Sequence, residues 1–228
     1  MIKIENLSIS FDEQQVINQL SAEFATAQIH GIVGLNGAGK TTFFNMLSTL
    51  LEADEGQILF NNQQITKHDA VYLETHNYFY SRITGNEYLR IFEQSNADFN
   101  LAVLQGFFQL PLDDLIETYS TGMKKKLALL SVLKQNKPIV LMDEPFNGLD
   151  LESNKVVELV VSALKEKGKT VFLSSHIIDP LLAVCDVIHL LANGQFVKTF
   201  EKAEFADIDQ HLFGKFKEEA RIMLAKAI

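Results

Sequence analysis

The sequence has a single cysteine and no long apolar run. Because Cys185 has no possible partner within the 228 residues, no disulfide can form inside the chain, which is typical of a reducing compartment. No window approaches 18 consecutive apolar residues, and the N-terminus lacks the basic and then apolar pattern of a secretion signal. We therefore expect a cytoplasmic protein, so any role at a membrane requires another chain.

Positive charge is also scarce. The 20 Lys and Arg residues against 29 Asp and Glu give a net charge of -9. This balance argues against a general nucleic-acid coat, although a local basic groove stays compatible with it, and we predict no nucleic-acid partner. Apolar residues make up 47% of the chain, which is enough for a sizeable core. The length suits one domain, residues 1–228, with room for an inserted lobe.

A glycine-rich loop follows a short apolar segment. The residues Gly34-Leu-Asn-Gly-Ala-Gly-Lys-Thr-Thr42 come directly after Ile29–Val33 and fit the template G-x-x-x-x-G-K-S/T. The glycines let backbone N–H groups turn inward at a helix start, which makes a cradle for an anion. Lys40 would reach the β- and γ-phosphates, and the Thr41 hydroxyl would bind magnesium. The pattern predicts a nucleoside triphosphate site formed by Gly34, Leu35, Asn36, Gly37, Ala38, Gly39, Lys40, Thr41 and Thr42.

Two apolar segments later in the chain end in polar side chains. Pro138–Pro145 has the form of a buried parallel strand whose tip carries Asp143 and Glu144. We expect Asp143 to hold magnesium through water and Glu144 to take a proton from an attacking water. The alternative, a helix cap, is disfavoured because an apolar strand precedes the acids. Thr170–His176 is a second such strand, and we expect His176 to hydrogen-bond the γ-phosphate or the attacking water.

Strand-like alternation opens the chain. Apolar and polar residues alternate over residues 2–11, and a second strand is predicted at Val16–Phe24. Phe11 lies at a strand end, where two interpretations stay open: stacking on adenine or packing in the core. After the glycine-rich loop, apolar residues at helical spacing predict a helix that reaches Leu50 and is closed by Asp54–Gly56.

The pattern changes between about residues 72 and 118. Short segments rich in aromatic residues are interrupted there by glycine and proline, without strand alternation. Weak helical periodicity predicts an inserted helical subdomain, whose rings either pack within it or face a partner. Residues from about 201 to 228 read as a charged helical tail that packs either on the core or on a second subunit.

The order of these motifs resembles that of the nucleotide-binding subunit of an ATP-binding cassette transporter. The resemblance runs from Met1 to about Phe200 and includes the glycine-rich loop, Y-S-T-G-M at Tyr119–Met123, I-V-L-M-D-E-P, N-G-L-D and S-S-H. It implies an α/β fold: a P-loop NTPase core with a mixed sheet, an N-terminal antiparallel β subdomain and an inserted helical subdomain. It also implies ATP and Mg²⁺ as cofactors and an ATPase activity coupled to transport. The pattern Y-S-x-G-M with a short lobe is most similar to the ATPases of exporters.

The resemblance implies roles for residues within one subunit. Phe11 matches the aromatic that stacks on adenine, and Asp143 matches the magnesium aspartate. Glu144 matches the catalytic base, and His176 matches the switch histidine that responds to the γ-phosphate.

The resemblance also implies partners. In the family two subunits sandwich two ATP molecules, so Ser120 and Gly122 would contact the nucleotide bound by the facing subunit. Asp150 would bridge to that subunit, which we expect to be an identical copy. A transmembrane permease in a separate chain would hold the dimer at the inner face of the cell membrane, where hydrolysis drives a mechanical cycle.

This sequence departs from the family pattern in two places. The family signature is L-S-G-G-Q. In this sequence Thr121 replaces its first glycine and Met123 replaces its glutamine, while the serine and the second glycine are kept. In the loop before the lobe, the family places a glutamine that touches magnesium or the attacking water. Thr75, next to Glu74, takes that position here, and either side chain is a candidate for the metal contact. The coupling between lobe movement and hydrolysis is the property that this change affects.

Three other functions compete with transport. Cassette ATPases that act on ribosomes or DNA usually carry tandem cassettes or long coiled-coil insertions, for which this chain has no room. A cassette for iron–sulphur assembly would have soluble rather than membrane partners. A nucleotide-gated adaptor would bind ATP with weak hydrolysis, in line with the missing glutamine.

Overall fold

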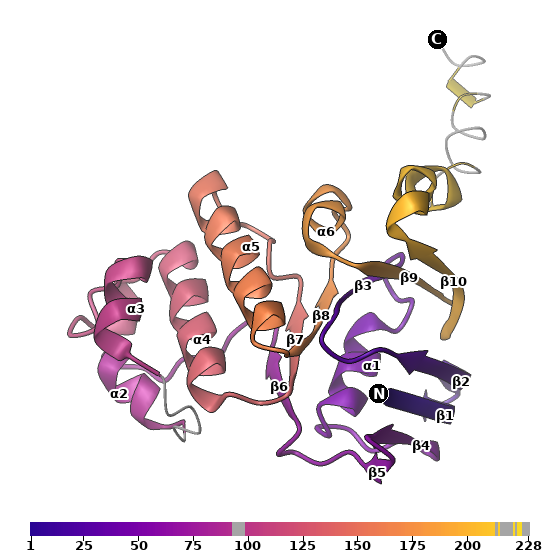
Figure 1. The fold of residues 1–228 in the computed structure, drawn as a ribbon, viewed down its shortest axis with the longest axis horizontal. Helices are drawn as coiled ribbons and strands as arrows, with labels where there is room; N and C mark the ends of the chain where they lie inside the picture. The colour runs from indigo at the N-terminus through magenta and orange to yellow at the C-terminus, as the bar shows by residue number, and fades with distance from the viewer. Residues whose placement is uncertain (93–98, 213, 215–220, 222, 225–228) are drawn as a thin grey trace.

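Two β-sheets and the helices around them build the fold (Figure 1). The computed structural model describes residues 1–92, 99–212, 214, 221, 223 and 224. The larger sheet is mixed, because five neighbouring strands are parallel and the last, β10, pairs antiparallel with β9. In spatial order its strands are β10 (Gln195–Glu201), β9 (Val187–Ala192), β3 (Ile29–Val33), β8 (Thr170–Ser174), β7 (Ile139–Asp143) and β6 (Ala70–Leu73).

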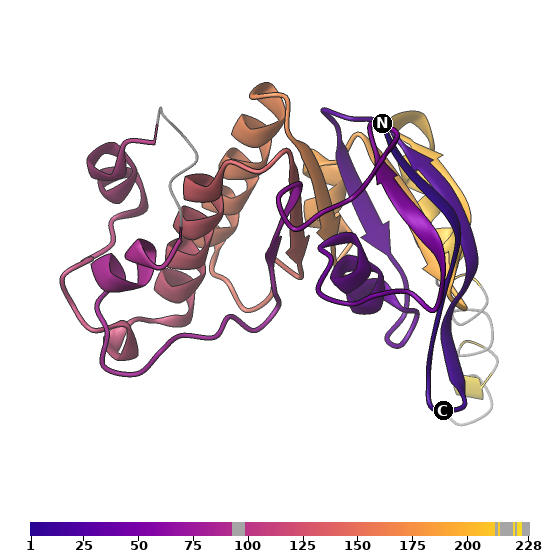
Figure 2. The ribbon, with the colours of Figure 1, turned by 90° about the horizontal axis from the view of Figure 1, so that it is seen from below.

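The smaller sheet is antiparallel and lies at the opposite end of the molecule from the inserted helices (Figures 1 and 2). In spatial order its strands are β2 (Gln14–Phe24), β1 (Ile2–Phe11), β4 (Glu55–Phe60) and β5 (Gln63–Gln64). The remaining elements are α1 (Lys40–Leu47), α2 (Gly85–Arg90), α3 (Leu101–Phe108), η1 (Ile116–Thr118), α4 (Thr121–Gln135), α5 (Leu151–Glu166), α6 (Asp179–Val184) and η2 (Lys202–Asp207). The expected α/β fold with a mixed sheet, an antiparallel subdomain and a helical insertion is confirmed.

Side chains from the central strands enter two different cores. In β7, Ile139 and Leu141 pack with α1 and the antiparallel sheet, whereas Val140 and Met142 pack with α4 and α5. This division arises because successive side chains of a strand point to opposite faces of the sheet. Both faces are buried here, which explains why the strand is almost entirely apolar. The two cores fix the carboxyl ends of the parallel strands at one edge, where the polar residues follow.

The helix after the glycine-rich loop is shorter than its periodicity predicts. α1 ends at Leu47, and Ser48 is its C-cap. Thr49 then has a φ of 62°, a left-handed conformation that ends the helix, and Leu50 is 65% exposed. The prediction that Asp54–Gly56 closes this helix is therefore wrong. Asp54 instead accepts a hydrogen bond from Ser10 N at 2.8 Å, and β4 begins one residue later.

The inserted part of the chain lies between the end of β6 and the start of α4. Thr84 and Glu87 form a capping box at the start of α2, which explains why a helix begins there. The aromatic residues divide between the two interpretations that the sequence left open: Tyr88 and Phe108 are buried, whereas Tyr78 is 75% exposed. Most of the predicted tail beyond residue 212 lies outside the described residues. None of the helices in the described part of the chain combines the length and the apolar character that a membrane span needs.

Two histidines form a buried hydrogen-bonded pair between β3 and β9. His30 Nε2 donates to Ala25 O at 2.8 Å, so His30 Nδ1 is left to accept from His189 Nε2 at 3.2 Å. Thr199 Oγ1 then donates to His189 Nδ1 at 3.0 Å. Burial lowers the pKa of both imidazoles, that of His189 to about 3, while the charge of Asp186 opposes the change at His30. The fold therefore holds this pair neutral.

We expect folding stability to fall as the pH drops below about 6.5. In the unfolded chain both histidines take up a proton near pH 6.5, whereas the folded pair resists protonation down to lower pH, so acid favours unfolding. For His189 alone the loss is about 2 kcal/mol at pH 5. Urea unfolding at pH 8 and pH 5 measures it. His189→Gln should reduce this pH dependence while the exposed control His76→Gln keeps it, and equal slopes in the two variants would contradict the account.

Candidate nucleotide site

The glycine-rich loop, residues 34–42, connects buried strand β3 to α1 and is called the phosphate loop below. Gly39 is the N-cap of α1 with a φ of 103°, and a Cβ there would lie 2.8 Å from Ile17 Cδ1. Gly34 leaves no room for a side chain either, because its Cβ would lie 2.4 Å from Leu191 O. These two positions require glycine, and the tight turn they allow points the first N–H groups of α1 into the loop.

The side chain of Lys40 folds back over the phosphate loop. It is 8% exposed, and its ammonium donates hydrogen bonds to Gly34 O at 2.8 Å and Leu35 O at 3.3 Å. The first turn of α1 contains no acidic residue, so nothing there offsets the positive end of the helix. Together the ammonium and the helix start form a cradle suited to phosphate groups.

The strand-tip acid Asp143 lies against the phosphate loop. Its Oδ2 accepts hydrogen bonds from Thr41 Oγ1 at 2.8 Å and from Tyr72 OH at 3.3 Å, and its Oδ1 accepts one from Ser174 Oγ. The carboxylate is 3% exposed, so these three donors replace water around it. The charge of Asp143 and burial also raise the pKa of Tyr72, with burial the larger cause, so the phenol stays a donor.

Thr41 and Asp143 fit a magnesium ion. Both present oxygen ligands, the type that Mg²⁺ prefers, and their side-chain oxygens already approach within 2.8 Å of each other. Among the described residues no group of three or more His, Cys, Asp or Glu side chains forms a metal cage. A site with few protein ligands suits magnesium, which usually keeps several waters and completes its shell with phosphate oxygens.

Glu144 and His176 form a pair beside Asp143. His176 Nδ1 and Glu144 Oε2 are 2.7 Å apart, and His176 N donates to the same oxygen at 3.3 Å. Glu144 has a φ of 49°, an unfavourable backbone conformation for a residue with a side chain, and Ser174 Oγ accepts its backbone N–H at 3.0 Å. This backbone conformation directs the Glu144 carboxylate toward His176. A carboxylate held in this way can accept a proton from water.

Sequence reasoning missed two residues of this site, Tyr72 and Ser174. Both lie on strands next to β7, and Ser174 is in register with Asp143. Ser174 could have been found from the sequence, because it is the polar last residue of an apolar strand. Such a residue lies beside the acid that ends the neighbouring parallel strand. Tyr72 has no comparable signal, because it lies within β6 and the sequence does not show which residue of β7 it is paired with.

The structure places the other predicted site residues apart from this cluster. Phe11 is 46% exposed at the end of β1, which excludes packing in the core and leaves adenine stacking as a prediction. Ser120 is the N-cap of α4, where its hydroxyl accepts from Met123 N at 3.2 Å. Asp150 is the exposed N-cap of α5, and hydrogen bonds from Ser153 lower its pKa.

The remaining predicted positions lie at the same strand edge or on α4. Gly122 lies close to α5, since a Cβ at this residue would come within 2.9 Å of Ser153 Oγ. Glu74 is exposed and Thr75 half-buried directly after β6, which runs parallel to β7. The parallel register brings both to the edge that carries Asp143, without assigning a metal contact to either.

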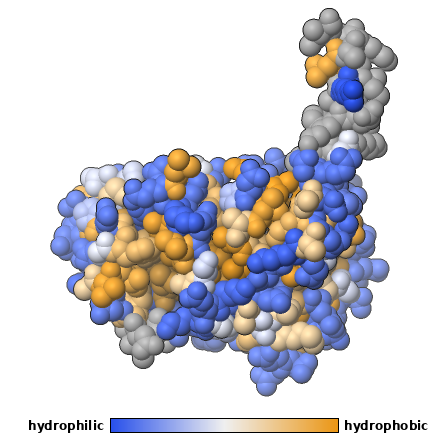
Figure 3. Space-filling view, turned by 45° about the horizontal axis from the view of Figure 1, so that its top comes forward, coloured by the Kyte–Doolittle hydropathy of each residue, from blue (hydrophilic) through white to orange (hydrophobic). Residues whose placement is uncertain are grey.

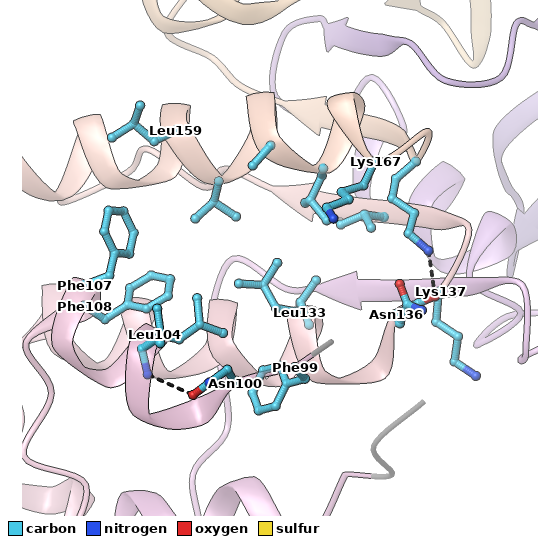
Figure 4. Close-up of a pocket in the computed structure, with 17 residues that line it drawn as sticks. Phe99, Asn100, Leu104, Phe107, Phe108, Leu133, Asn136, Lys137, Leu159 and Lys167 are labelled. Carbon is cyan, nitrogen blue, oxygen red and sulfur yellow. Dashed lines mark hydrogen bonds between the residues drawn. The ribbon is translucent and has the colours of Figure 1, made fainter. Parts of the chain in front are cut away.

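A large apolar cavity lies away from the phosphate loop. It has a volume of about 710 Å³ and is lined by α3, α4 and α5, with Leu104, Phe107 and Leu133 facing Leu159 across it (Figure 4). Figure 3 shows apolar surface gathered over the helical part of the molecule. Smaller cavities of about 380 Å³ and 180 Å³ border the phosphate loop, and the second also touches His176. The large cavity thus contains no residue of the phosphate loop and neither strand-tip acid, whereas the two small cavities border the loop and one of them also borders His176.

Comparisons with known proteins agree with this geometry. A family model described as "ABC transporter" matches residues 17–147, more than half of the chain. The ABC transporter ATP-binding protein YtrB of Bacillus subtilis is 27% identical over 216 residues, covering 91% of this chain and 74% of the relative. A putative ABC transporter ATP-binding protein of Pyrococcus furiosus is 31% identical over 221 residues, covering 90% and 81%. The bacitracin transport ATP-binding protein BcrA of Enterococcus faecalis is 28% identical over 217 residues, covering 90% and 70%.

Solved structures share the fold. The ATP-binding subunit of an ABC transporter superposes with a TM-score of 0.81 at 24% identity, covering 94% of this chain and 93% of that one. A dimeric ATP-binding cassette in a post-hydrolysis state, bound to ADP and phosphate, gives a TM-score of 0.77 at 20% identity, covering 89% and 99%.

Proposed function

The chain belongs to the ABC transporter family as an ATP-binding and ATP-hydrolysing subunit that powers a transporter, and on that premise we propose that it drives export through a separate permease. The observation that supports the ATPase part of this function is the contact between Thr41 and Asp143, with an oxygen–oxygen distance of 2.8 Å. It brings the phosphate loop and the strand-tip acids to one place, with the Glu144–His176 pair beside them. The elements of phosphoryl transfer therefore converge on one ligand position.

The proposed reaction is attack of water on the γ-phosphate of ATP, with ADP and phosphate as products. Lys40 exchanges its carbonyl partners for the β- and γ-phosphates, which the phosphate loop holds through its backbone N–H groups. Thr41 and Asp143 would hold Mg²⁺, which would supply the positive charge that neutralises the phosphate oxygens. Glu144 accepts the proton of the attacking water, and His176 fixes the orientation of that carboxylate.

We further propose that two identical copies close over two ATP molecules. Ser120 caps α4, and the first turn of α4 contains no acidic residue, so its positive end suits a γ-phosphate from the facing copy. Gly122 lets the start of α4 lie close to α5, and Asp150, the N-cap of α5, is exposed and available for a contact between subunits. The fold shared with a dimeric cassette supports this arrangement.

Export and membrane attachment are supported by sequence likeness. The relative BcrA is named as a bacitracin transport protein, and the Y-S-T-G-M segment resembles that of exporter ATPases. We place the dimer at the cytoplasmic face of the cell membrane, held there by the permease and free of nucleic acid. Thr75 and Glu74 occupy the place of the usual glutamine, and we assign them the coupling between permease and hydrolysis.

Coexpression with the product of the neighbouring gene tests the proposal, which predicts that this gene encodes a multi-span membrane protein. We expect the two to purify together in detergent and the complex to release phosphate from ATP and magnesium. Copurification with soluble partners alone would favour the iron–sulphur alternative instead. Binding of ATP without phosphate release, even in the complex, would favour a nucleotide-gated adaptor.

A further inference from the structure

Lys125 is a buried lysine whose ammonium has no hydrogen-bond partner among the described residues. The residue lies in α4 and is 6% exposed. Its Nζ has almost no accessible surface and reaches no acceptor in the part of the chain that the structure describes. Burying a lone ammonium is unfavourable, because the lost hydration must be offset by hydrogen bonds or opposite charge. The position of Lys125 therefore requires negative groups nearby.

The negative groups that act on Lys125 are the two acids at the tip of β7. Burial lowers the pKa of Lys125, and the charges of Asp143 and Glu144 oppose this change. Both oxygens of Asp143 already accept bonds from other residues, and Glu144 Oε2 is bonded to His176. Since Lys125 Nζ is within hydrogen-bond distance of neither acid, any effect of the ammonium on these carboxylates is exerted by its charge at a distance.

We propose that Lys125 is a positioning residue for ATP hydrolysis, whose fixed positive charge keeps the Asp143 and Glu144 carboxylates in place when the triphosphate binds. This inference rests on the proposed function of the site. Two adjacent carboxylates repel each other and the incoming phosphates, and partial burial leaves that repulsion poorly screened. A cation supplied from a separate helix reduces this repulsion without occupying the position of the metal or of water.

The place of Lys125 on α4 adds a connection between the two copies. Ser120, the proposed contact to the facing nucleotide, begins this helix, and Lys125 follows just over one turn later. One rigid helix therefore carries both a group for the facing copy and a charge for its own acids.

Steady-state hydrolysis and thermal unfolding of Lys125→Met test this role. Methionine is similar in length and apolar, so it removes the charge while still filling the space. We expect kcat to fall about tenfold or more while KM for ATP changes less than threefold. The melting temperature should stay equal or rise by about 2 °C, because an unpaired buried charge has been removed. Lys125→Arg should keep most of the activity, and Lys124→Met, one residue away, should match the wild type.

Each other outcome overturns the proposal. Wild-type kcat in Lys125→Met would show that the charge is not needed. A lower melting temperature with kcat and affinity both reduced, and no recovery in Lys125→Arg, would assign Lys125 a packing role. If the wild-type chain itself released no phosphate, the proposed function would fail. An active wild type with an equally active Lys125→Met variant would instead refute only the role of Lys125.

Discussion

Glu144→Gln is expected to reduce phosphate release by about 10²- to 10⁴-fold while leaving ATP binding intact. Glutamine keeps the shape of the side chain and one oxygen for His176, but it cannot accept the proton of the attacking water. The hydrogen bond that joins Glu144 Oε2 to His176 Nδ1 at 2.7 Å fixes the orientation of the carboxylate for which we propose this step. Bound ATP should therefore persist and hold two copies together. Single-turnover release of labelled phosphate measures the rate, and light scattering with ATP measures the dimer.

The half-buried acid Glu158, which lies outside the site, offers a matched control for this variant. It lies on α5 in an ion pair with Lys155, so Glu158→Gln makes the same chemical change outside the site. This control should hydrolyse ATP at the wild-type rate. Phosphate release by Glu144→Gln within threefold of the wild type would remove Glu144 from the mechanism, and monomers alone in the presence of ATP would argue against the sandwich dimer.

Lys40→Met is expected to weaken ATP binding by about 2–5 kcal/mol, roughly 30- to several-thousand-fold. The ammonium of Lys40 is buried over the phosphate loop and is the one side-chain cation within residues 34–42, so methionine removes the positive charge that the loop itself supplies to the phosphates. Titration of ATP and magnesium into the Glu144→Gln background measures this loss without interference from hydrolysis.

Folding must be monitored in the same variant. Gly34 O and Leu35 O lose the bonds from Lys40, so thermal unfolding of Lys40→Met establishes that the chain is intact. Lys67→Met, at an exposed position, should bind ATP as the wild type does. Affinity within threefold of the wild type in a folded Lys40→Met protein would mean that the phosphates bind elsewhere.

The sequence predicts those parts of the site that a local motif defines. The phosphate loop could be predicted because two of its positions accept only glycine, which keeps the motif visible in the sequence. Gly39 has a φ of 103°, and Leu191 O leaves no room for a side chain at Gly34. Asp143 could be read because an apolar strand that ends in an acid predicts a buried strand with a polar tip. The helical insertion is predicted from the loss of strand alternation, whereas the mixed sheet is implied by the resemblance of the motif order to a known family.

The parts that could not be predicted depend on packing between distant segments. The end of α1 is set by the left-handed conformation of Thr49, which the apolar periodicity through Leu50 conceals. Tyr72 reaches Asp143 across 71 residues of sequence, and only the register of β6 against β7 brings them together. Lys125 lies in a run of three lysines that look alike in sequence, and only the orientation of α4 buries the middle one. Phe11 illustrates the same limit, because its exposure depends on strand pairing.

The position of the γ-phosphate in the Glu144→Gln protein, crystallised with ATP and magnesium, tests the central claim most directly. The account predicts that Lys40 Nζ contacts this phosphate, that the metal binds the oxygens of Thr41 and Asp143, and that Ser120 of a second copy closes over it. A triphosphate bound away from Lys40, or a metal that leaves Thr41 and Asp143 bonded only to each other, would contradict it.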